Sequence, residues 1–164
     1  MIGNNTKNTA LVALQHPKSV ISEAFRSLRT NMQYINPGSP KQVLLITSSI
    51  SGEGKTFIST NMASIFSLSG KKTVLIGMDL RKPKLGKYLT DNDAYEGIGI
   101  TNYLTGNAGL GEIIQSSEAH ENLHFISSGA IPPNPAELLM LPQLETLLQR
   151  LREQYDCILI DLPP

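Results

Sequence analysis

The stretch VLLITSSISGEGKT, residues 43–56, decides the fold, because a short apolar run meets a glycine-containing turn there. The run at 43–47 is typical of a strand that is buried on both faces of a parallel sheet. Residues 55–69 then carry apolar side chains at helical spacing and lead to Gly70, a usual helix end. The segment therefore predicts a strand, a tight loop and a helix in direct succession.

The loop at 48–56 is a variant of the phosphate-binding template G-x-x-x-x-G-K-[ST], with Ser49 at the first glycine. Gly52 and Gly54 allow backbone N–H groups to face phosphate oxygens, beside the positive N-terminus of the helix. We therefore predict a nucleotide site, although a plain glycine turn before a helix would look similar. The expected nucleotide-binding residues are Ser49, Ser51, Gly52, Glu53, Gly54, Lys55, Thr56 and Phe57.

Carboxylates at the ends of two further predicted strands complete the expected site. Asp161 ends the run at 157–161, and Asp79 follows the run at 73–78. Because the carboxyl ends of parallel strands meet at one crevice, both are expected to act in catalysis and, with Thr56, to bind Mg²⁺. Asp79 has a second interpretation, since an Asp at this position also opens a turn with its own side chain.

Composition limits the class of protein. The chain has 164 residues, 40% of them hydrophobic and 17% charged, which suffices for a folded core. Fourteen basic and fourteen acidic residues cancel, so we predict no nucleic-acid partner. No apolar run reaches the ~18 residues that span a bilayer, and no secretory signal is recognisable, so a cytoplasmic location is expected. The single cysteine, Cys157, is expected to be a buried structural thiol.

The order of the expected elements predicts one α/β domain of the P-loop NTPase type. Strands and helices alternate along the chain, which predicts a doubly wound, mostly parallel sheet with helices on both faces. Residues 1–17 are expected to form an extended lead-in, and residues 18–164 the domain. Because a buried parallel strand is an odd place for a domain to stop, we expect further sheet beyond Pro164. The expected strands are 43–47, 73–78, 123–127 and 157–161, and the expected longer helices are 19–34, 55–69 and 142–154.

Five motifs occur in the order found in a known family. They are EAFRSLRTN (23–31), SSISGEGKT (48–56), VLIGMDLRKP (74–83), GAIPPNPAELL (129–139) and ILIDLPP (158–164). With these motifs, residues 16–164 resemble the bacterial tyrosine kinases of capsule and exopolysaccharide export, which are related to the MinD and ParA ATPases. The resemblance implies an ATP- and Mg²⁺-dependent protein-tyrosine kinase, with Lys55, Asp79 and Asp161 as catalytic residues.

The resemblance also implies partners. It implies a transmembrane activator, fused or separate, which would bring the domain to the inner face of the plasma membrane. It implies a ring-like homo-oligomer whose copies phosphorylate tyrosines of their neighbours. The family pattern Glu-x-x-Arg-x-x-Arg, which serves subunit contacts, falls on Glu23, Arg26 and Arg29. From the residues alone, the same helix face is a solvated surface with a local ion pair.

The sequence departs from the family in the Asp-x-Asp-x-Arg motif, where Gly77 replaces the first Asp. In the family this Asp is the base or metal-shell carboxylate for the incoming hydroxyl, and its loss is expected to weaken catalysis while leaving nucleotide binding intact. Ser51 stands where the loop commonly has Pro, and the five tyrosines are scattered rather than clustered. Two alternatives therefore remain: a nucleotide-binding regulatory subunit without catalysis, and a MinD- or ParA-type ATPase. The ATPase would require a further lysine near Ser48.

Overall fold

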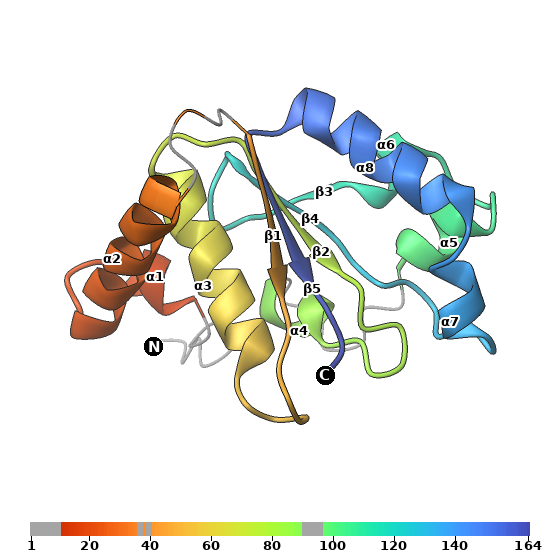
Figure 1. Ribbon diagram of the computed structural model, residues 1–164, viewed down its shortest axis with the longest axis horizontal. Coiled ribbons are helices and arrows are strands. Elements are labelled where there is room, and N and C mark those ends of the chain that lie inside the picture. Colours follow the sequence, from red (N-terminus) through yellow and green to blue (C-terminus); the bar gives the residue numbers. More distant parts are fainter. Residues whose placement is uncertain (1–10, 36–37, 39–40, 90–96) are drawn as a thin grey trace, which may run out of the picture.

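The computed structural model describes residues 11–35, 38, 41–89 and 97–164 as an α/β sandwich (Figure 1). Its sheet has the strand order β1-β5-β2-β4-β3. The first four strands in this order run parallel, and only β3 is antiparallel to its neighbour. The predicted mostly parallel sheet is thus confirmed. The strands are β1 (Gln42–Ile46), β2 (Thr73–Gly77), β3 (Gln115–Ser116), β4 (Leu123–Ile126) and β5 (Cys157–Asp161).

Helices cover both faces of this sheet, as predicted for a doubly wound fold. In Figure 1, α1, α2 and α3 lie to one side of the strands, whereas α5 to α8 lie to the other. The helices are α1 (Val12–Gln15), α2 (Val20–Ile35), α3 (Lys55–Leu68), α4 (Leu85–Leu89), α5 (Ile100–Leu104), α6 (Leu110–Ile113), α7 (Pro135–Leu138) and α8 (Pro142–Gln154). In the described part of the chain, no helix is long and apolar enough to cross a membrane.

The central strands β2 and β5 supply the core of both layers, because successive side chains point to opposite faces. Leu75 joins the cluster under α1, α2 and α3, whereas Val74 and Ile76 join the cluster under α5 and α8. All five residues of each of these strands are buried. Cys157 is one of them, so the predicted burial of its thiol is confirmed, and this burial raises the pKa of the thiol to about 12.

The predicted extended lead-in is wrong for its described part, because residues 12–15 form α1. Leu11 and Ala13 are almost fully buried, and the Ala13 N–H donates a 2.9 Å hydrogen bond to Asn61 Oδ1 on α3. This docking onto α3 stabilises a helix too short to show a period in the sequence. Residues 1–10 lie outside the described part of the chain. The two-residue strand β3 was also not predicted, because its Gln and Ser carry no apolar alternation.

The register brings the ends of three strands together. Asp161, the last residue of β5, pairs with Ile46 at the end of β1 and with Gly77 at the end of β2. The loop that follows β1 and the turn that follows β2 therefore flank Asp161. This edge carries most of the predicted site residues.

Candidate nucleotide site

The loop between β1 and α3 has the backbone shape that a phosphate cradle requires. Gly52 and Gly54 adopt φ angles of 95° and 86°, in the left-handed region that favours glycine. Gly54 is the N-cap of α3, and no side chain caps this end of the helix. The free N–H groups of the first turn thus remain available to an anion, with the helix dipole behind them.

Glu53 stabilises the loop from within. Its Oε2 accepts hydrogen bonds from the Ser49 N–H at 3.0 Å and the Ile50 N–H at 3.3 Å. The carboxylate is therefore engaged with the loop backbone, and a contact to the nucleotide would come from the main chain of Glu53. Sequence reasoning included Glu53 in the site but missed this role.

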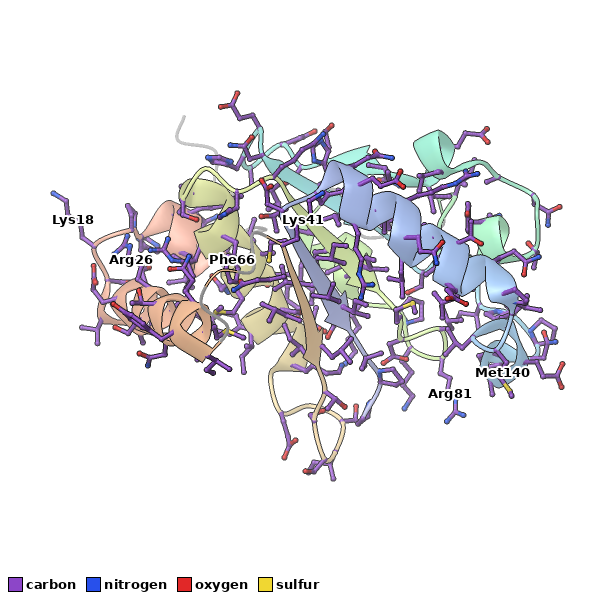
Figure 2. All side chains as sticks on the ribbon, turned by 45° about the horizontal axis from the view of Figure 1, so that its top comes forward. Lys18, Arg26, Lys41, Phe66, Arg81 and Met140 are labelled. Atoms are coloured by element: carbon purple, nitrogen blue, oxygen red, sulfur yellow. The ribbon has the colours of Figure 1, made fainter. Side chains whose placement is uncertain are left out.

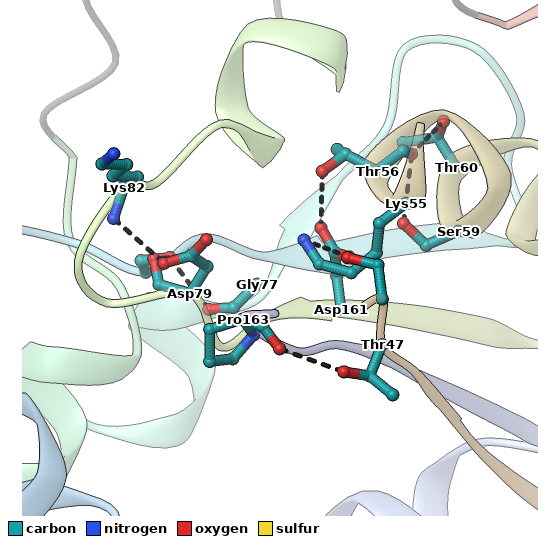
Figure 3. Close-up of polar contacts among 12 residues, drawn as sticks. Thr47, Lys55, Thr56, Ser59, Thr60, Gly77, Asp79, Lys82, Asp161 and Pro163 are labelled. Carbon is teal, nitrogen blue, oxygen red and sulfur yellow. Dashed lines mark hydrogen bonds and ion pairs between the residues drawn. The ribbon is translucent and has the colours of Figure 1, made fainter. Parts of the chain in front are cut away.

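A buried contact joins the loop to the end of β5 (Figure 3). The Thr56 hydroxyl donates a 2.9 Å hydrogen bond to Asp161 Oδ2, and Lys55 Nζ lies 3.6 Å from Oδ1. Asp161 is 3% exposed, and burial raises the pKa of its carboxyl against the opposing effects of Thr56 and Lys55. The predicted association of these three residues is present in the structure.

The Asp161 carboxylate fits a magnesium ion. Its Oδ1 is buried and has no hydrogen-bond donor. Together with the Thr56 hydroxyl it offers hard oxygen ligands, and Mg²⁺ in phosphate sites typically takes one or two protein oxygens besides water and phosphate. A cation would bind Oδ1, which Lys55 Nζ approaches only to 3.6 Å, and would offset the cost of burying its charge.

The turn interpretation of Asp79 is confirmed, whereas its catalytic role stays a prediction. Its Oδ1 accepts hydrogen bonds from the N–H groups of Arg81, at 3.2 Å, and Lys82, at 3.0 Å, which makes it the opener of a turn. It also lines the same cavity as Lys55 and Thr56. Its negative charge contributes to the raised pKa of Asp161.

The cavity has a volume of about 270 Å³ and lies between the loop and the segment that follows Asp79. Of the predicted loop residues, Ser49 and Glu53 are not part of its lining. Five lining residues were not among the predicted site residues, and for three of them the place directly after the Asp79 turn was a usable signal. The five are Ser48 and Pro164, and the three after the turn, Lys82, Lys84 and Tyr88. The lining residues are Ser48, Ser51, Gly52, Gly54, Lys55, Thr56, Phe57, Asp79, Lys82, Lys84, Tyr88 and Pro164.

Side chains of neighbouring segments pack closely around Gly77. A Cβ at this residue would lie 3.2 Å from Leu85 Cδ2 and 3.3 Å from Ser128 Oγ. The Ser128 hydroxyl bonds to the carbonyls of Gly77, at 2.9 Å, and Asp79, at 3.3 Å. A side chain at residue 77 therefore requires these neighbours to move by a few tenths of an ångström, and Asp79 is the carboxylate that remains at the end of β2.

The predicted interface residues lie on α2, away from this cavity. Arg26 pairs with Glu23 and also donates to the Pro17 carbonyl, while Arg29 donates a long 3.5 Å hydrogen bond to the Ile65 carbonyl of α3. In Figure 2, Arg26 lies at one end of the molecule and Arg81, next to the site, at the other. The structure thus separates this helix face from the predicted catalytic residues.

Comparisons with known proteins agree with this geometry. A family model described as an AAA domain matches residues 41–164. The tyrosine-protein kinase YwqD of Bacillus subtilis is 35% identical over 155 residues, which cover 94% of this chain and 63% of YwqD. A putative tyrosine-protein kinase in the cps region of Klebsiella pneumoniae is 35% identical over 161 residues, 98% of this chain and 22% of that protein. The chain thus spans less than two thirds of each of these relatives.

Solved structures give the same result. The kinase domain of the Escherichia coli tyrosine kinase ETK superposes with a TM-score of 0.88 at 32% identity, over 96% of this chain and 60% of that domain. The septum site-determining protein MinD from Pyrococcus horikoshii, complexed with Mg-ADP, gives a TM-score of 0.62 at 26% identity, over 74% and 48% of the two chains. Together with the loop geometry, these matches identify the family: the chain belongs to the bacterial tyrosine kinases, a branch of the P-loop ATPases.

Proposed function

We propose that this chain binds ATP and ADP with Mg²⁺ and forms the core of an autophosphorylating protein-tyrosine kinase that controls capsule or exopolysaccharide synthesis. The observation that carries the proposal is the buried contact of Thr56 with Asp161, directly below the uncapped N-terminus of α3. Relatives named as tyrosine kinases, one of them from a cps region, support the substrate class.

The residues of the site have distinct parts in this reaction. The N–H groups around Gly54 bind the phosphates, and Lys55 turns from Asp161 towards the terminal phosphate. Thr56 and Asp161 would hold the magnesium ion, which would neutralise charge on the phosphates. The phenolic oxygen of the acceptor forms a bond to the γ-phosphorus while the bond to the bridging oxygen of ADP breaks. Asp79 takes the phenolic proton.

Gly77 makes this transfer slow, because Asp79 replaces only in part the carboxylate that the family carries at residue 77. A missing base or metal-shell carboxylate costs about 10²- to 10⁴-fold in rate, whereas nucleotide binding depends on other groups. The same observation favours a second candidate, a regulatory subunit that binds nucleotide and controls polysaccharide length without catalysis. Leu85 and Ser128 pack closely around Gly77, where the chain has no carboxylate. This packing is consistent with a slow kinase and with a regulatory subunit.

Assembly is part of the proposal. Large apolar side chains are exposed along α2, which fits a contact surface that includes the Glu23, Arg26 and Arg29 face. Met140 is exposed at the opposite end of the molecule, an arrangement that suits head-to-tail rings of copies (Figure 2). We propose such a ring, acting on tyrosines in trans and located at the inner face of the plasma membrane through a transmembrane activator. The exposed apolar residues of α2 are Val20, Ile21, Leu28, Tyr34 and Ile35.

A phosphotyrosine blot after incubation with Mg·ATP, beside an equilibrium titration with a fluorescent ADP, tests the function. Binding with slow tyrosine phosphorylation supports the kinase, and binding without any phosphorylation supports the regulatory subunit. Absence of binding overturns both. Lys55→Met is the control, because it removes the phosphate-bridging cation and should abolish both signals.

A further inference from the structure

The cavity has a second wall besides the phosphate loop. One wall is the loop around Gly54, whose N–H groups and Lys55 suit phosphates. The other wall comes from the segment after Asp79 and consists of Lys82, Lys84 and Tyr88. We call these three residues the acceptor wall.

The lysines of the two walls differ in whether a carboxylate pairs with them. Lys55 has a partner, because Asp161 lies 3.6 Å from its Nζ. Lys82 and Lys84 are exposed, and in the described part of the chain no carboxylate forms an ion pair with either. Asp79 does not neutralise them by contact, since its Oδ1 accepts the backbone N–H of Lys82 instead. The acceptor wall therefore carries two positive charges that no described carboxylate pairs with.

The position of Asp79 indicates which ligand would approach the positive charges of Lys82 and Lys84. Figure 3 shows Asp79 between Lys82 and the group formed by Lys55, Thr56 and Asp161. The proposed proton acceptor thus separates the phosphate side from the acceptor wall. A ligand that contacts the acceptor wall therefore lies on the side of Asp79 from which the hydroxyl that is to be phosphorylated approaches.

Tyr88 adds an aromatic surface to this side. It is only partly exposed, and its ring packs against the core cluster under α3, which fixes its position. A fixed aromatic ring beside the cavity suits an aromatic ligand, because paired rings attract each other beyond their buried area.

We propose that the acceptor wall selects tyrosines flanked by aspartate or glutamate, with the flanking carboxylates on Lys82 and Lys84 and the tyrosine ring beside Tyr88. This inference rests on the proposed kinase site and names its substrate class. The competing ligand of the same chemistry is the terminal phosphate of the nucleotide itself, and the test separates the two.

The test uses binding, so that slow catalysis does not affect it. Two fluorescein-labelled peptides carry one central tyrosine flanked either by glutamates or by glutamines. Their affinities are measured by fluorescence anisotropy on the full chain saturated with Mg²⁺ and a non-hydrolysable ATP analogue. Nucleotide affinity is titrated separately on each variant. If the nucleotide does not bind, the proposed function fails, and peptide discrimination measured without nucleotide then decides the inference.

We expect the glutamate peptide to bind about threefold to tenfold more tightly than the glutamine peptide, because two exposed ion pairs contribute a gain in affinity of this size. Replacing both lysines, Lys82→Ala with Lys84→Ala, should remove this preference, whereas nucleotide affinity changes less than about twofold. The preference should also shrink at high salt. Lys18→Ala with Arg150→Ala, the same charge change at exposed sites on other elements, should leave it intact.

Tyr88 has its own pair of variants. Tyr88→Phe keeps the ring and should bind both peptides as the parent does, whereas Tyr88→Ala should weaken both. The proposal is overturned if the parent chain does not discriminate between the peptides, or if the lysine variant still does. It is also overturned if the lysine variant loses nucleotide affinity tenfold with unchanged discrimination, because the lysines then serve the nucleotide phosphate.

Discussion

The Thr56 hydroxyl lies 2.9 Å from Asp161 Oδ2, and this hydrogen bond joins the first turn of α3 to the last residue of the central strand β5. Both side chains are buried, so the bond holds the phosphate loop in place against the sheet. Thr56 and Asp161 are also the proposed ligands of a magnesium ion. On this proposal, the same pair of side chains stabilises the free chain and takes part in the chemistry of the nucleotide-bound chain.

The charge of Asp161 should cost stability in the free chain. Burial raises the pKa of this carboxyl, so the fold disfavours its ionised form at neutral pH. We predict that Asp161→Asn raises the melting temperature of the nucleotide-free chain at pH 7 by about 2 °C or more, and removes the stabilisation that Mg·ADP gives the parent chain. Thermal unfolding with and without Mg·ADP measures both. A melting temperature several degrees below that of the parent would contradict this account.

Restoring the carboxylate at residue 77 should restore catalysis. Gly77→Asp is expected to raise tyrosine phosphorylation at least about tenfold. Because Leu85 and Ser128 must shift, it should also lower the free energy of unfolding by about 1 kcal/mol. Phosphotyrosine formation and urea unfolding measure the two effects.

Gly111→Asp is a suitable control, since Gly111 is exposed and a Cβ there meets nothing within 4 Å. It adds the same charge away from the site and should change neither quantity. An unchanged phosphorylation rate in Gly77→Asp would show that Gly77 does not limit this chain.

Glu53 should act by preorganising the loop. Glu53→Ala removes the acceptor for the N–H groups of Ser49 and Ile50, and nucleotide affinity should fall about threefold to tenfold as the loop loses its bound shape. Glu53→Gln keeps an acceptor oxygen and should retain most of the affinity. Titration with a fluorescent ADP compares the variants, and equal affinities for all three chains would refute the role.

His124 should make the fold sensitive to acid. Burial, and then the charge of Lys72, lower its pKa below the ordinary value of 6.5, and its ring stands edge-on to Tyr155. The unfolded chain therefore binds this proton at a higher pH than the folded chain, so stability is lost as the pH falls below 6.5. We predict a smaller drop in melting temperature between pH 7.5 and 5.5 for His124→Gln than for the parent. Exposed His16, replaced in the same way, should leave the drop unchanged.

The sequence predicted those parts of the site whose positions follow from local geometry. Lys55 and Thr56 follow the turn that starts a helix, and Asp161 ends a buried strand, so their places were set by spacing alone. Contacts between distant segments could not be read in this way. Ser128 reaches the Gly77 carbonyl from the segment that follows β4, and α1 forms because Ala13 meets Asn61 on α3. The ring contacts of α2 and the role of Gly77 remain predictions.

The magnesium dependence of nucleotide binding tests the central claim most directly. Calorimetric titration of ADP into the chain, in excess Mg²⁺ and in EDTA, is compared for the parent and Thr56→Ala. We predict that Mg²⁺ tightens binding at least about tenfold in the parent and less than about twofold in the variant. Equal magnesium dependence in both chains, or no binding to the parent, would contradict the site built on Thr56 and Asp161.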